Sequence, residues 1–125
     1  KHVGVSNFSP DLFMEALDLG DILTNQVKFN PDNLQSENLK IAREHDRIIT
    51  AYSPLERGDV VGDDQLEQIA EKYQKSVAQV TLRWLIQLGN VSVIPKAAKS
   101  EHRQANIDIF DFELSEEDMQ NIGEA

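Results

Sequence analysis

Short apolar runs alternate with segments of helical periodicity along the whole chain. The apolar runs lie at 2–8, 23–30, 47–55 and 91–96. Apolar residues with helical spacing follow at 10–19, 35–45, 65–74, 77–89, 100–110 and 115–123. Strands that alternate with helices predict right-handed crossovers and a parallel sheet. No linker is long enough to split the pattern, so we expect one α/β domain over residues 1–125.

Several of the expected helix ends carry residues that favour a boundary. Ser9 followed by Pro10 predicts an N-cap and a first helical residue, and Gly20 predicts the end of that helix. Ser115, followed by the acidic residues Glu117 and Asp118, predicts the start of the last helix. The helix boundaries therefore agree with the apolar periodicity.

The ends of the expected strands carry polar and aromatic residues, where parallel α/β proteins bind ligands. Amide groups there can pair with a carboxamide, and an aromatic ring can stack on a planar ligand. A lysine before a helix start favours an anion, so Lys96 is expected to face a phosphate. The alternative is turn chemistry alone, because Asn, Ser and Pro are common at strand ends. These ends read Ser6-Asn7, Asn25-Gln26, Tyr52-Ser53-Pro54 and Pro95-Lys96.

The charge and composition narrow the function classes. The formal net charge is −10, which argues against nucleic acid and anionic membrane surfaces as partners. The chain has no cysteine, no apolar stretch of membrane-spanning length and no signal-peptide pattern. We therefore expect a cytoplasmic protein without a disulfide, and we assign no metal site.

Five segments, in this order, resemble the second half of the aldo-keto reductase family. They are GVSNF, NQVKFNP, AYSPL, VAQVTLRWLIQLG and VIPKAAKSEHRQANIDIFDFEL. Members of that family are (β/α)8 barrels that reduce carbonyl groups with NADPH, and sometimes with NADH. The resemblance implies half of a (β/α)8 TIM barrel, a (βα)4 unit with parallel strands five to eight and an extra C-terminal helix.

The resemblance also assigns cofactor-binding roles to eight positions of this chain. From nicotinamide to adenine, they are Ser6, Asn7 and Gln26 for the carboxamide, Tyr52 for stacking on the ring, Ser53 and Leu55 for the pyrophosphate path, Lys96 for the adenosine-side phosphate and Asn106 for adenine. The implied cofactor is NADP or NAD.

The sequence departs from the family pattern near Lys96. Ala97 stands where the family usually has Ser or Thr, and Ala105 stands where a Glu is common. His102 replaces the arginine that grips the 2′-phosphate, although Arg103 lies beside it. A neutral histidine does not replace a fixed guanidinium fork. The preference between NADPH and NADH is therefore open.

No segment resembles the strands that carry the family's catalytic tetrad of Asp, Tyr, Lys and His. Tyr52 is assigned to stacking, and Tyr73 has the spacing of a core residue. We therefore assign no catalytic residue and expect at most weak cofactor binding, with little or no reductase activity from this chain alone. Two alternatives remain: a fragment of an active NAD(P)H-dependent reductase, and a structural or self-associating scaffold without a ligand.

Half a barrel leaves two sheet edges open, and parallel sheets are normally covered on both faces. We expect inner-face residues to be partly exposed to water, and a second copy to pair edge to edge and complete an eight-stranded barrel. The expected assembly is therefore a homodimer or a larger homo-oligomer. The residues expected on the inner face are Val3, Val5, Val27, Ile49 and Val93.

Overall fold

A computed structural model describes residues 3–52, 54, 64–95 and 100–123. The strands in this part of the chain are β1 (Val3–Ser6), β2 (Ile22–Lys28), β3 (Ile48–Tyr52) and β4 (Val91–Ile94). All neighbouring pairs are parallel, and the strand order is β1-β2-β3-β4. The parallel sheet predicted from the alternating pattern is therefore confirmed.

A helix follows each strand, and a second helix follows both β3 and β4. The helices are α1 (Pro10–Leu19), α2 (Ser36–Glu44), α3 (Asp64–Tyr73), α4 (Val77–Gln87), α5 (Ser100–Ile107) and α6 (Glu116–Ile122). This order confirms the (βα)4 arrangement with an additional C-terminal helix. Within the described ranges, no helix has both the length and the apolar character needed to cross a bilayer.

Three helices begin at serine residues that cap them. The side chain of Ser9 accepts a hydrogen bond in the first turn of α1, with Pro10 as the first helical residue. The side chain of Ser115 caps α6 in the same way. Ser76 and Gln79 form a reciprocal capping box at α4, with N···O distances of 3.1 and 3.0 Å. Local sequence therefore determines where these helices start.

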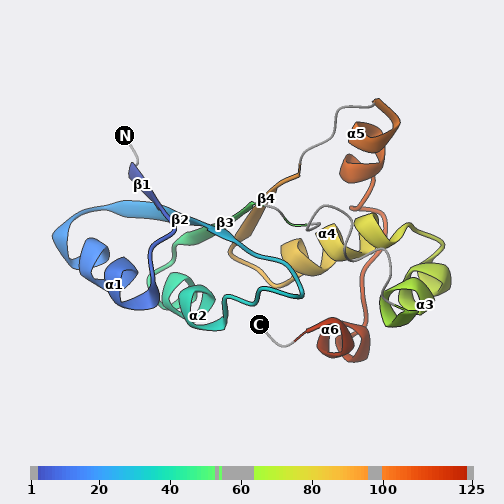
Figure 1. The fold of residues 1–125 in the computed structure, drawn as a ribbon, viewed down its shortest axis with the longest axis horizontal. Helices are drawn as coiled ribbons and strands as arrows, with labels where there is room; N and C mark the ends of the chain where they lie inside the picture. The colour runs from blue at the N-terminus through green and yellow to red at the C-terminus, as the bar shows by residue number, and fades with distance from the viewer. Residues whose placement is uncertain (1–2, 53, 55–63, 96–99, 124–125) are drawn as a thin grey trace.

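The helices α1, α2 and α4 lie along one face of the sheet (Figure 1). Strand residues directed at these helices are mostly apolar, and Ile49 and Ala51 are fully buried. Strand positions alternate between the two faces, so the residues between them lie on the opposite, open face. Across the sheet, that face carries the row Ser6, Gln26, Thr50 and Ser92, whose members lie opposite one another in register.

The apolar residues expected on the open inner face are not exposed there. Val27 and Ile49 are 3% and 0% exposed, and Val5 and Val93 pack against the same core. They belong to the helix-covered face, because burying apolar side chains against helices is favourable. Only Val3, at the start of β1, is largely exposed, at 57%. The open face is therefore more polar than the sequence pattern predicted.

The core continues from the sheet into the helices at the C-terminal end of the chain. The rings of Phe29 and Trp84 pack edge to face with centroids 5.9 Å apart, and both are fully buried. The indole Nε1 of Trp84 donates to the backbone oxygen of Met119 at 3.1 Å. This bond ties α6 to α4, so the last helix is part of the domain.

Candidate functional site

Four of the predicted cofactor-binding residues meet at the carboxyl ends of β1, β2 and β3. Ser6 ends β1, Asn7 follows it, and Gln26 lies opposite Ser6 in the register of β1 and β2. Tyr52 ends β3. The Ser6 hydroxyl donates to the backbone oxygen of Gln26 at 3.4 Å, which is a long hydrogen bond. The carboxyl-terminal end of the sheet thus carries two amides, a hydroxyl and a phenol.

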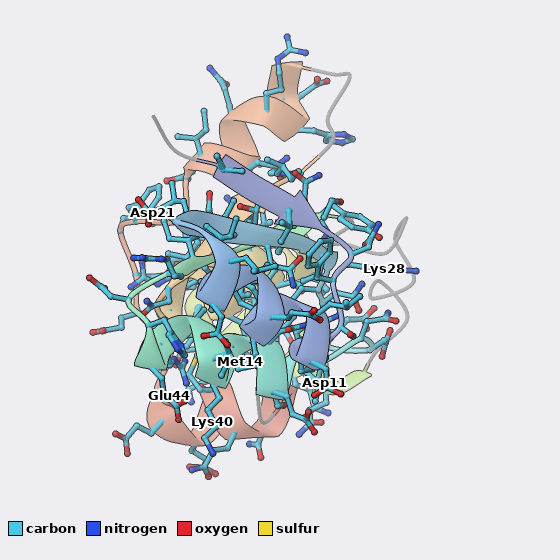
Figure 2. All side chains as sticks on the ribbon, turned by 90° about the vertical axis from the view of Figure 1, so that its left-hand side faces the viewer. Asp11, Met14, Asp21, Lys28, Lys40 and Glu44 are labelled. Carbon is cyan, nitrogen blue, oxygen red and sulfur yellow. The ribbon has the colours of Figure 1, made fainter. Side chains whose placement is uncertain are left out.

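The helix starts lie at the same end of the molecule as these residues. Figure 2 shows Asp21 and Lys28 at opposite ends of β2, with Asp11 of α1 on the side of Lys28. Glu44, at the end of α2, lies on the side of Asp21 (Figure 2). Helix N-termini present free N–H groups and the positive end of the helix dipole, so this end of the molecule favours anionic ligand groups.

Asn7 adopts a backbone conformation that is uncommon for residues other than glycine. Its φ is +58°, in the left-handed region that asparagine tolerates better than most residues. Its backbone N–H donates to the oxygen of Gln26 at 2.8 Å. This bond continues the pairing of β1 with β2 by one residue and fixes where the chain turns toward α1.

A hydrogen bond joins the side chains of Tyr52 and Asn7. The phenol Oη of Tyr52 donates to Oδ1 of Asn7 at 2.7 Å, across the intervening strand β2. The Tyr52 ring is half-buried and the Asn7 side chain is exposed. A ring for stacking and amides for pairing therefore lie side by side, and this chemistry suits a planar ring that bears a carboxamide.

Asn25, which the sequence groups with Gln26 as a strand-end amide, instead faces the core and supports this site from the opposite face of the sheet. Its side chain is fully buried and bonds to both backbone groups of Phe8, accepting at 3.2 Å and donating at 3.0 Å. Asn38 donates to the oxygen of Phe8 at 3.3 Å and to Gln35 at 3.0 Å. Gln35 donates to the backbone oxygen of Lys28 at 2.9 Å. The signal in the sequence for this supporting role was an asparagine at a strand position that faces the core.

Asn106 lies apart from this cluster. It is on α5, which follows β4 and lies beyond the β4 edge of the sheet, away from β1 (Figure 1). Asn106 lines a groove of about 430 Å³ together with Val93, Pro95 and Phe110. Ile107 and Phe110 are 70% and 68% exposed, so the groove has an apolar rim. Two separate parts of the chain thus carry the predicted site.

Three of the predicted residues, Ser53, Leu55 and Lys96, lie outside the described residues, so their roles stay predictions. Their described neighbours are consistent with strands that end at this edge. Pro54 is buried, and Pro95 comes directly after β4 and lines the groove beside α5.

The helix α5 is attached to the domain by Gln79. The Nε2 group of Gln79 donates to the backbone oxygen of Ala105 at 3.0 Å. His102 and Arg103 are exposed on the same helix, whereas Ala97 lies outside the described residues. His102 and Ala105, two of the residues that depart from the family pattern, therefore lie on a helix that α4 holds in place.

Two clusters of charged residues away from this site have shifted pKa values. Hydrogen bonds from Tyr73 and Lys72 lower the pKa of Asp118, which is buried. Hydrogen bonds to Asp111 and Asp108 raise the pKa of Lys75. Among the described residues, no group of three or more His, Cys, Asp and Glu residues is placed to hold a metal ion.

The protein-family model that matches the chain is the one described as "Aldo/keto reductase family", and it matches residues 1–125. The glyoxal reductase of Bacillus subtilis (strain 168) is 45% identical over 122 residues, which are 96% of this chain and 44% of that protein. The aldo-keto reductase of Mycobacterium sp. (strain KMS) is 36% identical over 98% of this chain and 45% of its own length. The chain therefore spans less than half the length of these curated relatives.

Solved structures have the same fold over the matched region. An aldo/keto reductase from Brucella melitensis matches with a TM-score of 0.87 and 37% identity, over 95% of this chain and 46% of that chain. A variant of Gox0644 in complex with NADPH matches with a TM-score of 0.88 and 34% identity, over 95% of this chain and 44% of that chain. The predicted fold, about half of a TIM barrel, is confirmed.

Proposed function

Because the chain belongs to the aldo/keto reductase family, we propose that it binds a nicotinamide dinucleotide, NADP or NAD, at the carboxyl ends of β1 to β3. The observation that carries this proposal is the hydrogen-bonded pair of Tyr52 and Asn7, 2.7 Å apart at the strand ends where the resemblance assigns nicotinamide contacts. The pair combines an aromatic ring with an amide, as a planar ring bearing a carboxamide requires.

The nicotinamide end of the cofactor has the best-defined residues. The side chains of Ser6, Asn7 and Gln26 would pair with the carboxamide, and the Tyr52 ring would stack on the nicotinamide. These four residues lie on neighbouring strands, and Asn7 is held by its backbone bond to Gln26. When bound, the cofactor supplies hydride chemistry at its nicotinamide ring. The residues of this chain bind and orient that ring.

The phosphate and adenine end relies on residues further along the chain. Ser53 and Leu55 would follow the pyrophosphate, Lys96 would meet the adenosine-side phosphate, and Asn106 would contact adenine. The groove beside Asn106 supports the last assignment, because its apolar rim suits the face of a base. The matched Gox0644 variant in complex with NADPH supports the cofactor class. His102 keeps the choice between NADPH and NADH open.

We further propose that this chain alone has little or no reductase activity. No segment of its sequence resembles the strands that carry the family's Asp, Tyr, Lys and His tetrad. Proton donation by a positioned side chain contributes about 10²- to 10⁴-fold to such reactions. A panel of carbonyl substrates with NADPH should give no more turnover than a blank without protein. Turnover clearly above both the blank and a Tyr52→Phe variant would contradict the proposal.

The alternative is that the chain is one part of an active NAD(P)H-dependent reductase. The shared length favours this alternative, because the chain spans 44% of the matched glyoxal reductase. The genomic sequence upstream of this segment discriminates between the two proposals. An open reading frame with the Asp, Tyr, Lys and His motifs would make the chain part of a full reductase, and its absence would favour a separate half barrel.

Titration of the chain with NADPH and with NADH, followed by fluorescence or calorimetry, tests the binding proposal. We expect saturable binding that Tyr52→Ala weakens about three- to tenfold, because a stacked ring is worth about 0.5–1.5 kcal/mol. Lys96→Ala should also weaken binding, and it should weaken NADPH binding more as salt is lowered. Lys40→Ala, on the exposed side of α2, is the matched control. No binding of either dinucleotide at millimolar concentration would favour the scaffold alternative.

A further inference from the structure

The Tyr52 side chain has two chemical parts, and only the ring is needed for stacking. The hydroxyl has a partner of its own, Oδ1 of Asn7, at 2.7 Å. That distance is typical of a well-formed O–H···O hydrogen bond. The two residues come from β3 and from the end of β1, with β2 between them. The phenol therefore reaches across the open face to the amide of Asn7.

We propose that the Tyr52 hydroxyl positions the Asn7 amide, so that Asn7 presents its NH₂ group to the carbonyl oxygen of a nicotinamide carboxamide. The inference rests on the dinucleotide-binding function proposed above. It separates two roles of one residue: the ring contacts the cofactor, and the hydroxyl acts through Asn7. It also predicts which atom of the ligand Asn7 recognises.

The physical reason is that an asparagine amide has two different ends and turns readily. Its oxygen accepts hydrogen bonds and its NH₂ group donates them, and the terminal torsion has two broad, nearly equivalent minima. The phenol holds the oxygen on the side of β3. The NH₂ group then points away from Tyr52 and can donate a hydrogen bond to an acceptor atom of a ligand.

The backbone at Asn7 restricts the remaining freedom. Its positive φ and its N–H bond to the oxygen of Gln26 fix where the Asn7 side chain leaves the chain. On the other face of the sheet, Asn25 holds both backbone groups of the next residue, Phe8. The orientation of the amide is therefore the main freedom left at this position, and the Tyr52 hydroxyl sets it.

Titration of four forms of the full 125-residue chain tests the inference: the unsubstituted chain, Tyr52→Phe, Asn7→Ala and the double variant. Tyr52→Phe keeps the ring and removes only the hydroxyl. We expect it to weaken NADPH or NADH binding about three- to tenfold, the effect of losing one oriented hydrogen bond. In the Asn7→Ala background, the same change should alter affinity by less than about twofold, because the group that the hydroxyl orients is gone.

A second ligand identifies the atom that Asn7 recognises. The 3-acetylpyridine analogue of the cofactor keeps the carbonyl oxygen and lacks the carboxamide NH₂ group. If Asn7 donates to that oxygen, Tyr52→Phe weakens binding of the analogue by the same factor as binding of the natural cofactor. Asn7→Asp, which keeps an acceptor for Tyr52 and loses the donor, should weaken binding of both ligands.

The outcomes separate this inference from the proposed function. If the unsubstituted chain shows no saturable binding, both are overturned. If it binds while Tyr52→Phe binds equally well and Tyr52→Ala does not, only the ring matters and the positioning role is wrong. An analogue insensitive to Tyr52→Phe would overturn the predicted direction of the Asn7 bond. Tyr73→Phe removes the same hydroxyl elsewhere and should leave binding unchanged, with circular dichroism confirming that each variant is folded.

Discussion

Asn25 and Gln26 are adjacent in β2, but their side chains lie on opposite faces of the sheet and therefore have different roles. Gln26 is half-exposed on the open face, where a ligand can reach it. Asn25 is fully buried, and its amide satisfies the N–H and the oxygen of Phe8. A buried backbone group without a partner is costly, so Asn25 stabilises the turn that places Asn7.

Asn25→Ala should therefore destabilise the fold, although Asn25 is buried and does not lie on the open face. The substitution removes two hydrogen bonds and leaves both backbone groups of Phe8 with fewer partners. We expect the free energy of unfolding to fall by about 2 to 4 kcal/mol. Urea unfolding followed by circular dichroism measures this change.

Asn38→Ala is the matched comparison for this prediction. Asn38 donates to the same Phe8 oxygen at a longer distance of 3.3 Å and to the Gln35 side chain at 3.0 Å. Its own Oδ1 is buried with no hydrogen-bond partner among the described residues, so the substitution also removes an unsatisfied polar atom. Its removal should cost about 1 kcal/mol or less. If the two substitutions cost the same, Asn25 does not have the supporting role assigned to it.

At the scale of single residues, the sequence predicted which side chains lie close together. It did not predict the hydrogen bonds between them. The strand ends identified Asn7 and Tyr52, because parallel strands end at one edge of the sheet. The bond between their side chains joins residues 45 positions apart, and no local pattern encodes it. The role of Asn25 was also missed, because Gln26 beside it was the residue that matched the family.

Among the elements, α6 depends on charged and polar contacts with α3. The carboxylate of Asp118 accepts hydrogen bonds from Tyr73 at 2.7 Å and from Lys72 at 2.9 Å. The Tyr73 oxygen also accepts from the N–H of Ser115 at 2.9 Å. The hydrogen bonds from Tyr73 and Lys72 lower the pKa of Asp118 below its ordinary value of 3.8. A carboxylate with a lowered pKa in the folded state stabilises that state wherever it is ionised.

The stability contributed by Asp118 should therefore be lost in acid. It is fully present above the ordinary value of 3.8, and it declines as the pH falls through 3.8 toward the lower pKa of the folded state. At neutral pH, Asp118→Asn should lower the free energy of unfolding by about 1 kcal/mol, because the charge is lost while an acceptor remains. The difference from the unsubstituted chain should shrink as the pH falls from about 5 to about 3.

Chemical unfolding at a series of pH values measures that difference. Asp18→Asn, at an exposed position on α1, is the matched control for the loss of one carboxylate elsewhere in the chain. A constant difference between Asp118→Asn and the unsubstituted chain across this range would show that the charge of Asp118 does not stabilise α6.

The elements themselves were predictable where local rules determine them. Ser9, Pro10 and Ser115 mark helix starts in the sequence, and the helices begin there. The long-range contacts of the helices were not predictable in this way. Gln79 is an example: its place in the capping box follows from local spacing, whereas its bond to the Ala105 oxygen depends on how α5 folds back.

For the whole molecule, the unusual feature is a parallel sheet with one covered face and two outer edges. Within the described residues, β1 and β4 each pair with one strand only. Apolar residues were predicted on the open face, but the structure places Thr24, Gln26, Thr50 and Ser92 there. The alternation of strand residues was visible in the sequence, but the choice of face depends on where the helices pack.

This arrangement changes the reason to expect self-association. Burying a polar face contributes little to the free energy of association. The main contribution would therefore come from pairing β4 of one copy with β1 of another. The edges offer unpaired backbone groups and the exposed side chains of Val3 (57%) and Ile94 (47%). The net charge of −10 on each copy opposes association at low salt. We therefore expect a weak homodimer that strengthens as salt is added.

Sedimentation velocity over a range of micromolar concentrations, at low and at high salt, measures this equilibrium. Val3→Lys places a charge on the β1 edge, and charges on edge strands suppress pairing. It should shift the equilibrium toward the monomer by about tenfold or more, since a buried lysine at such a contact would lose its hydration. Leu19→Lys, at an 83% exposed position on α1, adds the same charge away from the strand edges and should have a smaller effect. A monomeric mass at every concentration and salt level would mean that the edges stay unpaired. The half barrel would then exist as a single copy, and any completing strands would have to come from a different polypeptide segment.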